Sequence, residues 1–454
     1  MTIHPDLIVS VSGIRGVVGT SLTPDVALRF AMAYGSPFRG QTILLSRDGR
    51  PSGDSLGHAI AAGLTAVGCN VIDIGIAPTP SVGVAVTWLK AAGAVQITAS
   101  HNPAIWNGLK MFGPDGAVLP AAEGAAVKER FLKGDYQSAA WDGVGRTHSF
   151  DSNDVWTEHI RRIQPLVDGD QIRRAGFSVL VDANGGSGGP LALRLLSELG
   201  VKTVSIGCES TGHFAHEAEP IPAHLTTIAP EVTKTKSAIG FVLDPDADRL
   251  ALIDEHGQCI SEEVTLALAV KSVLKTRKGA VVVNMSTSRM NEDLARAAGC
   301  EFIRSAVGEA NVVDAIRSHH AAIGGEGNGG VIEPRVGWVR DPFVGMAYIL
   351  ALMAEENQPI SQIIASLPSY AMLKTKCQVS RESLSASLAR LRDHWPRANI
   401  NTVDGLRIDG PDWWLHVRPS NTEPVVRAIA EAPTTKQAQE LCEIATRILS
   451  QATS

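Results

Sequence analysis

The stretch AIGFVLDPDADR, residues 238–249, joins an apolar run to an unusual acidic loop. The apolar run, residues 238–243, is typical of a strand buried in a parallel sheet, where both faces are covered. The acidic run DPDADR, residues 244–249, begins where that strand would end. Because ligands of open α/β sheets bind beyond the carboxyl ends of the strands, this stretch predicts an α/β domain with a ligand-binding loop at residues 244–249.

Three units with the same order of elements follow one another along the chain. In each unit an apolar strand precedes a polar loop, a helical stretch and two further strands. The expected first strands are residues 42–46, 178–181 and 280–283, the second 70–74, 202–206 and 301–304, and the third 94–98, 238–243 and 321–324. Strands that alternate with helices predict right-handed crossovers and a mainly parallel sheet. The third strands end in the loops TASHNP (98–103), DPDADR (244–249) and GEGNGG (325–330).

The C-terminal segment has a different pattern. Residues 415–417 and 425–429 flank the loop RPSNTEP, residues 418–424, and predict two strands with a tight connection before a helix near residues 435–450. We expect residues 361–376 to form a linker. A chain of 454 residues has room for three or four domains. We therefore predict three similar mixed α/β domains in series and a smaller C-terminal α+β domain around one central cleft, with boundaries at 1–152, 153–257, 258–370 and 371–454.

The composition argues against several classes of protein. A net charge of −6 does not suit a nucleic-acid partner, which requires a basic face. The six cysteines are far apart in the sequence, which favours reduced thiols over a metal clip or a redox motif. The sequence shows no signal peptide and no apolar stretch of the ~18 residues that a membrane span needs. We therefore expect a cytoplasmic protein without a membrane partner.

The loop DPDADR carries the strongest chemical signal. Asp244, Asp246 and Asp248 alternate with small residues, so an extended loop can turn all three carboxylates to one side. Their mutual repulsion favours a bound cation, and hard oxygen ligands suit Mg²⁺ or Ca²⁺. An EF-hand would place Glu255 at its twelfth position but needs glycine where Arg249 stands. Three carboxylates favour Mg²⁺ over Ca²⁺, and the remaining alternative is a solvated acidic turn.

Ser100 lies in TASHNP, directly after an expected strand. At such a corner a serine is expected to be exposed and able to reach a substrate. The neighbouring His101 could assist proton transfer or hydrogen bond to a phosphate. The residues alone favour a different interpretation, in which Ser100 caps a helix, because serine before Asn and Pro is a frequent helix start.

Two more loops carry polar groups suited to a sugar phosphate. Glu326 and Asn328 in GEGNGG could bind hydroxyls, although a plain flexible turn is equally consistent with this glycine-rich segment. RPSNTEP offers a phosphate cradle or an ordinary hairpin turn, and its candidate ligands are Arg418, Ser420, Asn421 and Thr422. Arg15 and Lys110 could attract a phosphate on Ser100, but each alone is more often a surface cation.

Together these loops resemble those of the α-D-phosphohexomutase family, which includes phosphoglucosamine mutases, phosphomannomutases and phosphoglucomutases. The resemblance covers nearly the whole chain, with the motifs in the family's order and one in each domain. TASHNP is similar to the phosphoserine loop, DPDADR to the metal loop, GEGNGG to the sugar-recognition loop and RPSNTEP to the phosphate-binding loop. The segments SGIRG (12–16), NGLK (107–110) and AVG (306–308) also match. Four loops in register outweigh the helix-cap interpretation of Ser100.

The resemblance implies a mechanism. Ser100 would carry a phosphate in the resting enzyme, and one Mg²⁺ ion would be held by this phosphate and the three aspartates. The phosphate would pass to a hexose monophosphate, and the resulting hexose 1,6-bisphosphate would turn over and return its other phosphate to Ser100. RPSNTEP would grip the phosphate that is not reacting, and Glu326 would contact the sugar hydroxyls. Positive charge around the transferred group would come from Lys110, Arg15 and Arg249.

The sequence departs from the family in the sugar-recognition loop. Many members carry serine where Asn328 stands and histidine, a candidate acid or base, where Gly330 stands. The proton acceptor is therefore unassigned. We expect an isomerase, a phosphoglucosamine mutase first and a phosphomannomutase or phosphoglucomutase second, which acts as a monomer or homodimer. A phosphatase that hydrolyses a phosphoserine and a sensor without catalysis are the weaker alternatives.

Overall fold

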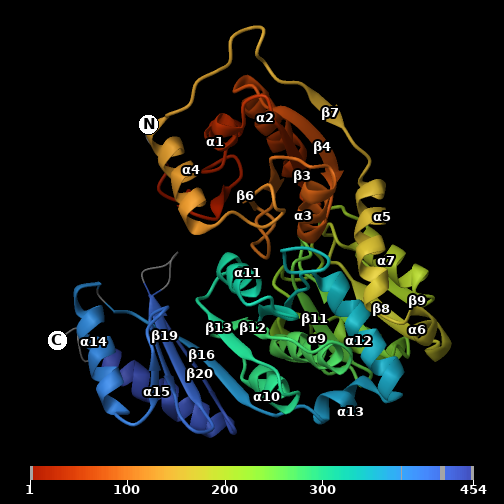
Figure 1. The fold of residues 1–454 in the computed structure, drawn as a ribbon, viewed down its shortest axis with the longest axis vertical. Helices are drawn as coiled ribbons and strands as arrows, with labels where there is room; N and C mark the ends of the chain where they lie inside the picture. Colours follow the sequence, from red (N-terminus) through yellow and green to blue (C-terminus); the bar gives the residue numbers. More distant parts are fainter. Residues whose placement is uncertain (1–3, 380, 420–424, 451–454) are drawn as a thin grey trace.

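The computed structural model describes residues 4–379, 381–419 and 425–450. Figure 1 shows three α/β units and a separate C-terminal unit, which follow one another around the molecule in chain order. This arrangement confirms the predicted fold class. The domain boundaries themselves stay a prediction.

The first unit is built on a seven-stranded mixed sheet with the order β1-β2-β6-β5-β3-β4-β7. Its central strands β5, β3 and β4 are parallel, and β6 runs antiparallel to β5. The strands are β1 (Ile8–Ser10), β2 (Gly13–Val17), β3 (Thr42–Arg47), β4 (Asn70–Ile76), β5 (Gly93–Ile97), β6 (Trp106–Phe112) and β7 (Thr147–Ser149). The main helices are α1 (Pro24–Gly35), α2 (Ser52–Ala66), α3 (Thr79–Trp88) and α4 (Ala121–Lys133).

The second and third units repeat the central part of this sheet with the orders β11-β10-β8-β9 and β13-β12-β14-β15. In all three units the first strand lies between the second and the third, so the three sheets share one central order. The second unit contains β8 (Ser178–Asp182), β9 (Lys202–Ile206), β10 (Ile239–Leu243), β11 (Leu250–Asp254) and α7 (Gly189–Glu198). The third contains β12 (Val281–Asn284), β13 (Phe302–Ser305), β14 (Ile323–Glu326), β15 (Gly330–Ile332), α9 (Glu262–Thr276), α10 (Met290–Ala297), α11 (Glu309–Ser318) and α12 (Pro342–Glu356).

An antiparallel fourth strand follows the third strand of every unit: β6, β11 or β15. The sequence did not predict this strand. It places each distinctive loop in a turn between two hydrogen-bonded strands, so the loop is held at both ends. In the second unit, for example, Leu243 at the end of β10 pairs directly with Leu250 at the start of β11.

The C-terminal unit is a five-stranded antiparallel sheet with the order β16-β20-β19-β18-β17. The predicted strand pair is confirmed as β19 (Trp414–Pro419) and β20 (Val426–Ala432), and helix α15 (Thr435–Ser450) follows. The remaining elements are β16 (Ala371–Cys377), α14 (Arg381–His394), β17 (Asn399–Asn401) and β18 (Leu406–Asp409).

The predicted linker, residues 361–376, is wrong. Helix α13 (Ile360–Ala365) occupies its beginning, and β16 pairs with β20 along its whole length. The segment AMLKTKC of β16 is only partly buried, which is typical of an edge strand. It lacks the long apolar run that marks the buried strands of the other units.

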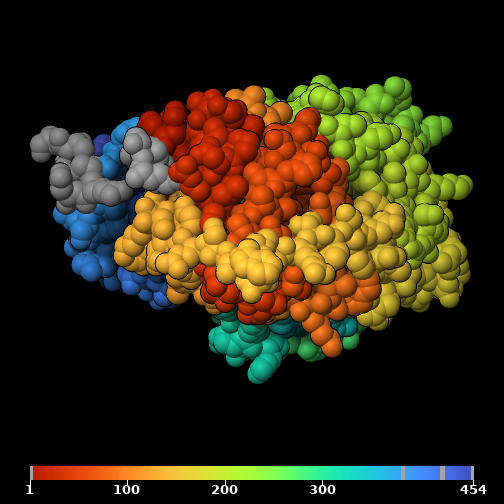
Figure 2. Space-filling view, turned by 90° about the horizontal axis from the view of Figure 1, so that it is seen from above, coloured from red at the N-terminus to blue at the C-terminus, as the bar shows by residue number. Residues whose placement is uncertain are grey.

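A buried series of side-chain hydrogen bonds connects the units. Ser81 of α3 contacts Nδ1 of His159 at 2.8 Å, and Nε2 of the same ring lies 2.7 Å from Oδ2 of Asp341. His159 belongs to α5 (Ser152–Ile163). The polypeptide segment that leads to α5 crosses the surface of the first unit (Figure 2). Asp341 also caps α12 through the N–H groups of Phe343 and Val344. This series of hydrogen bonds therefore links the first unit to the third.

In the described part of the chain, all six cysteines are free thiols. None of the described helices combines the length and the apolarity needed to cross a membrane.

Candidate active site

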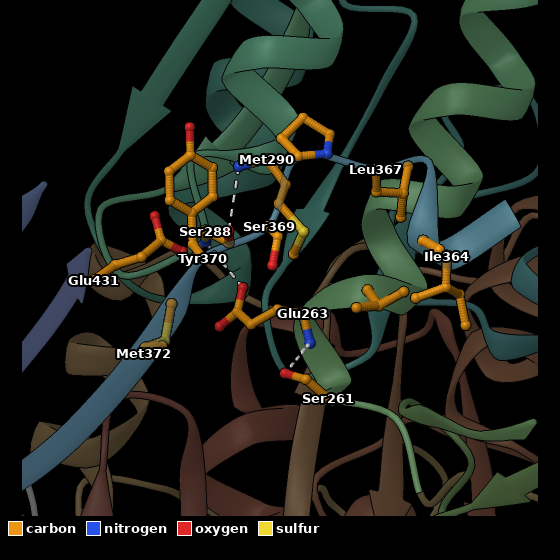
Figure 3. A pocket seen from close by; sticks show the side chains of 13 residues that line it. Ser261, Glu263, Ser288, Met290, Ile364, Leu367, Ser369, Tyr370, Met372 and Glu431 are labelled. Atoms are coloured by element: carbon orange, nitrogen blue, oxygen red, sulfur yellow. Dashed lines mark hydrogen bonds between the residues drawn. The ribbon is translucent and has the colours of Figure 1, made fainter. Parts of the chain in front are cut away.

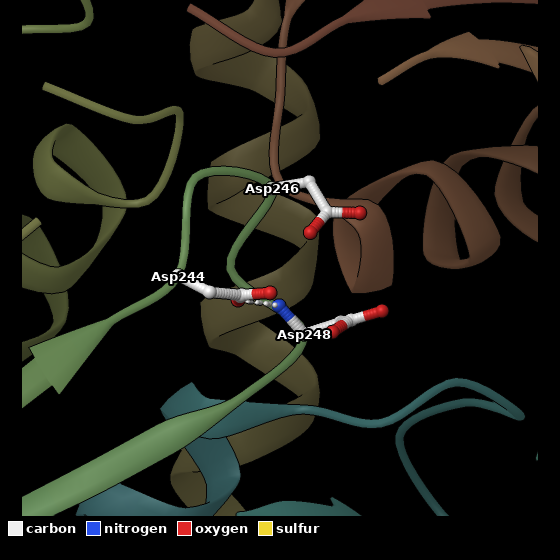
Figure 4. A group of neighbouring side chains, drawn as sticks. All are labelled: Asp244, Asp246 and Asp248. Carbon is white, nitrogen blue, oxygen red and sulfur yellow. Dashed lines mark hydrogen bonds between the residues drawn. The ribbon is translucent and has the colours of Figure 1, made fainter. Parts of the chain in front are cut away.

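The three aspartates of the acidic loop lie in the turn between β10 and β11 (Figure 4). Each of Asp244, Asp246 and Asp248 is fully buried, and one carboxylate oxygen from each lies within 4.8 Å of the others. Ala247 adopts a left-handed φ of 50°, which turns the chain sharply between the second and third aspartate. The alternation DPDADR thus produces a convergent trio, as the sequence predicts, but in a tight turn.

One oxygen of each carboxylate is held by hydrogen bonds from the protein. Oδ1 of Asp244 accepts from the backbone N–H groups of Asp248 and Arg249, at 2.9 and 3.0 Å. Oδ2 of Asp248 accepts from Lys110 at 3.0 Å and from Arg340 at 2.6 Å. These contacts fix the orientation of both carboxylates.

Asp246 is held in the same way and leaves one oxygen unpaired. Its Oδ2 accepts from Thr79 at 2.7 Å and from Lys110 at 2.9 Å. Its Oδ1 is buried and has no hydrogen-bond partner in the structure, and the same is true of Oδ1 of Asp248. Unpaired buried carboxylate oxygens are costly unless a ligand satisfies them. The donor set therefore fits a divalent cation with oxygen ligands.

The electrostatics of the trio support this assignment. Burial raises the pKa of Asp244 well above its usual range, and the charges of Asp248 and Asp246 raise it further. Burial alone would also raise the pKa of Asp248, but Arg340, Lys110 and Arg249 together hold it well below its usual range. A cation between the carboxylates would remove the repulsion that Asp244 experiences.

Ser100 lies beside this trio. Its Oγ donates to Oδ2 of Asp244 at 3.3 Å and lies 3.2 Å from Nδ1 of His101. The expectation that Ser100 is exposed is wrong, because only 3% of the residue is accessible between the two loops. The helix-cap interpretation is wrong as well, since a turn leads from Ser100 directly into β6. Ser100 adopts a left-handed φ of 51°, an uncommon conformation for serine.

Arg50, which the sequence analysis missed, holds the backbone of the Ser100 loop. Its guanidinium donates to the carbonyl oxygens of Ser100 and Asn102 at 2.7 and 2.8 Å, and to those of Pro103 and Trp106 at 2.8 and 3.0 Å. Its Nε donates to Asp48 at 3.0 Å. The only signal in the sequence is the position of Asp48 and Arg50 at the end of the first strand.

The remaining residues predicted around Ser100 lie close to it. Burial, and then the charges of Arg249 and Arg15, lower the pKa of His101 to about 3, so its ring is neutral near pH 7. Arg15 donates to the side chain of Asn102 at 3.2 Å, and Arg249 pairs with Glu219 at 3.1 Å. Arg15, Arg249 and Lys110 thus place three positive charges around the serine and the aspartates.

The sugar-recognition loop connects β14 to β15. Glu326 ends β14, and its Oε1 and Oε2 accept from Asn284 at 2.9 Å and from Arg340 at 2.8 Å. Asn328 is half-buried, and its Oδ1 has no partner in the structure. Glu326 is joined to Asp248 of the acidic loop through the guanidinium of Arg340, which the sequence analysis did not single out.

Glu263 packs against the same loop at Gly327, and the sequence analysis missed it as well. A Cβ at Gly327 would overlap the carboxylate of Glu263, so any other residue there would displace that side chain. Burial raises the pKa of Glu263 to about 8. This carboxylate lines a pocket of about 420 Å³ between α9, α10 and the segment leading to β16, together with Tyr370 and Glu431 (Figure 3). The residues that line the pocket include none of the predicted site residues.

The phosphate-binding loop can be placed only in part. Arg418 lies near the end of β19, and its Nε is 3.2 Å from Oδ1 of Asp404. The other three predicted ligands, Ser420, Asn421 and Thr422, lie outside the described residues.

Comparisons with known proteins identify the domains of the chain. The chain matches the three phosphoglucomutase/phosphomannomutase alpha/beta/alpha domains I, II and III at residues 6–138, 154–257 and 261–370. The C-terminal domain of the same family matches residues 375–447. The chain belongs to the phosphoglucomutase/phosphomannomutase family. It is therefore a phosphohexomutase, an isomerase that transfers phosphate within a sugar phosphate, as the sequence predicts.

Individual relatives cover almost the whole chain. A phosphoglucomutase/phosphomannomutase of Thermococcus kodakarensis is 35% identical, over 97% of this chain and 98% of its own. A probable phosphoglucosamine mutase of Methanopyrus kandleri is 35% identical, over 95% of both chains. The crystal structure of a phosphoglucomutase/phosphomannomutase family protein from Burkholderia thailandensis superposes with a TM-score of 0.84 at 28% identity, over 98% of this chain and 97% of its own.

Proposed function

We propose that this phosphohexomutase interconverts the 1-phosphate and 6-phosphate of a hexose through a phosphoserine at Ser100. The observation that carries the proposal is the contact of the Ser100 hydroxyl with Asp244, in a buried site where Asp246 and Asp248 each keep one unpaired oxygen. A phosphate on Ser100 would therefore form directly beside a cation site. Lys110 and Arg15 lie close enough to this centre to attract its charge.

Mg²⁺ is the cation that we propose, with Asp244, Asp246, Asp248 and the Ser100 phosphate as its ligands. When bound, it would neutralise charge on the transferred phosphoryl group. Three carboxylates in a small buried turn suit one Mg²⁺ that keeps some of its water.

The chain's own residues would orient the reaction. The bond between phosphorus and Oγ of Ser100 breaks while a bond to the sugar hydroxyl oxygen forms; that hydroxyl loses one proton and the freed Oγ gains one. In the return step Oγ attacks the other phosphate of the hexose 1,6-bisphosphate and gives up its proton, and the sugar oxygen that leaves gains one. The ring of His101, 3.2 Å from Oγ, is placed to exchange the proton of Oγ, because the negative charge of a bound phosphate would raise its pKa from the low value that burial, Arg249 and Arg15 produce. Lys110, Arg15 and Arg249 would stabilise the negative charge that spreads over the phosphoryl oxygens.

The C-terminal loop would hold the phosphate that is not reacting. We assign this role to Arg418, Ser420, Asn421 and Thr422, and contacts with the sugar hydroxyls to Glu326 and Asn328. A bisphosphate that turns over between two half-reactions needs one grip that works for either phosphate. Catalytic amounts of hexose 1,6-bisphosphate should therefore activate the enzyme by phosphorylating Ser100.

Glucosamine phosphate is the substrate that we propose first, because several relatives that match nearly the whole chain are named probable phosphoglucosamine mutases. Glucose or mannose phosphate is the alternative, since another relative of equal identity is named phosphoglucomutase/phosphomannomutase. The predictions of a monomer or homodimer, of a cytoplasmic location, of no nucleic-acid partner and of the four domain boundaries are retained.

The experiment measures the 6-phosphate formed from glucosamine, glucose and mannose 1-phosphate, each with Mg²⁺ and a trace of the matching bisphosphate. We expect turnover with at least one sugar and the highest kcat/KM with glucosamine 1-phosphate. Ser100→Ala should bind the substrate but lose turnover by several orders of magnitude. Ser46→Ala is the control, because Ser46 is an equally buried serine of the same sheet that donates only to the carbonyl of Gly75. If none of the three sugars is converted, or if inorganic phosphate is released faster than product, the proposal is wrong.

A further inference from the structure

Arg340 occupies the space between two loops of different domains. Its Nη2 lies 2.6 Å from Oδ2 of Asp248 in the acidic loop, and its Nη1 lies 2.8 Å from Oε2 of Glu326 in the sugar-recognition loop. Its side chain is only 11% exposed. A planar guanidinium can satisfy two carboxylates at fixed angles, which the single ammonium group of a lysine cannot do.

The backbone of Arg340 is held on both sides. Its own N–H donates to Oε1 of Glu309 at 2.7 Å. The next residue, Asp341, caps helix α12 and also contacts His159. The fixed backbone therefore limits the positions that the guanidinium can adopt. Through its hydrogen bonds, the guanidinium in turn limits the orientation of the two carboxylates that it contacts.

The residue at position 330 decides whether Arg340 can lie there. A Cβ built on Gly330 would overlap the Cδ atom of Arg340 and lie 3.1 Å from Oδ1 of Asn328. Gly330 pairs with Glu326 across the β14–β15 turn, so its backbone cannot move away without shifting Glu326. Any side chain at position 330 would displace the arginine from its present position.

The orientation of Glu326 depends on this arginine. Its two carboxylate oxygens have one donor each, Asn284 on Oε1 and Arg340 on Oε2. Without Arg340 the carboxylate would keep a single donor and could rotate about its last bond. A carboxylate that binds sugar hydroxyls must be fixed in order to discriminate between sugars.

We propose that Arg340 is a positioning residue for sugar recognition, which fixes Glu326 against the acidic loop and lies there because residue 330 is glycine. This inference rests on the proposed function, in which Glu326 contacts the sugar. Arg340 and Gly330 form one unit, because the arginine occupies the space that a side chain at position 330 would fill.

The test compares Arg340→Met with Arg335→Met. Arg335 is a matched control, because it also pairs with a glutamate, Glu333 at 2.9 Å, but contacts neither loop. The affinity of glucosamine 6-phosphate is measured by calorimetry in the Ser100→Ala background, where no turnover occurs. Loss of one charge-assisted hydrogen bond to Glu326 should weaken binding about tenfold or more for Arg340→Met and less than twofold for Arg335→Met. Equal affinities would overturn the inference.

A double-mutant cycle separates positioning from a general loss of stability. Gly330→Ala should weaken binding about tenfold when Arg340 is present and less than twofold in the Arg340→Met background, with thermal unfolding confirming that each variant is folded. Glu326→Gln and Arg340→Met should likewise be less than additive. Additive effects in both cycles would overturn the inference.

The binding assay also distinguishes this inference from the proposed function. If the protein with Ser100 converts none of the three hexose phosphates but binding still depends on Arg340, the mutase proposal fails and the positioning role stands. If turnover occurs but the affinity does not depend on Arg340, the mutase proposal stands and the positioning role of Arg340 fails.

Discussion

Oγ of Ser100 lies 3.3 Å from Oδ2 of Asp244, although the two residues are 144 positions apart in the chain. They follow the third strands of two different sheets, at the turn that each strand makes into an antiparallel neighbour. The repeat of the α/β unit therefore creates the site, because equivalent turns of successive units face one another. The predictions below depend on this convergence.

Mg²⁺ should stabilise the folded protein through the aspartate trio. We expect Mg²⁺ at 100 times its dissociation constant to stabilise by about 2.7 kcal/mol, equivalent to a rise in Tm of several degrees. Asp246→Asn should lose most of this rise, because the unpaired Oδ1 of Asp246 is one of the proposed ligands of the ion. Differential scanning calorimetry with and without Mg²⁺ measures the effect. Asp254→Asn, at the far end of β11, should keep the full rise, and an equal response of both variants would contradict the assignment.

Arg50→Met should impair both stability and turnover, since it removes every hydrogen bond that the guanidinium donates to the Ser100 loop. Loss of one partner from the buried pair with Asp48 costs about 3–5 kcal/mol. We expect kcat to fall at least a hundredfold, because the left-handed backbone of Ser100 loses its support. The comparison is Arg47→Met, which breaks a partly exposed pair with Asp54 worth about 0–1 kcal/mol. Comparable kcat values for the two variants would show that Arg50 does not position the serine.

The pH dependence of stability should report the buried carboxyl of Glu263. Burial raises its pKa to about 8 in the folded protein, above the value near 4.5 in an unfolded chain. The folded state therefore binds the proton of Glu263 more tightly than the unfolded state does. The contribution of this proton to the free energy of unfolding is complete below pH 4.5 and is lost as the pH rises through 8.

Glu263→Gln removes this titration, so its Tm relative to the unmodified protein should increase with pH. We expect a gain of several degrees between pH 5.5 and pH 9, equivalent to roughly 3 kcal/mol, because about 2.5 pH units separate pH 5.5 from the folded pKa and each unit is worth about 1.4 kcal/mol. Thermal unfolding across this range provides the measurement, and Glu262→Gln, which breaks a pair with Lys374, serves as the control. A constant difference across the range would mean that Glu263 is already ionised at low pH.

The sequence predicted those features that depend on local pattern. The apolar runs predicted the strands of the three repeats, because buried strands carry a local apolar signature. The alternation of Asp244, Asp246 and Asp248 predicted that their carboxylates converge, although a tight turn at Ala247 and not an extended loop brings them together. The exposure of Ser100 was wrong, since burial of that serine depends on Asp244 and on an arginine 50 positions away.

The residues that sequence reasoning missed act through partners in other elements. Arg50 binds backbone carbonyls, Arg340 bridges two loops and Glu263 packs on a glycine, and none of these contacts has a sequence signature. The fold can be inferred from the periodicity of the sequence. The residues that hold the site loops in place can be identified only from the three-dimensional structure.

Transfer of phosphate to Ser100 is the central claim, and a labelling experiment tests it most directly. The protein is incubated with Mg²⁺ and hexose 1,6-bisphosphate carrying ³²P, and the label is located after tryptic digestion. The account predicts label in the peptide of residues 91–110, which contains Ser100, and none in the Ser100→Ala protein. Label in a different peptide, or mutase turnover without any labelled protein, would contradict it.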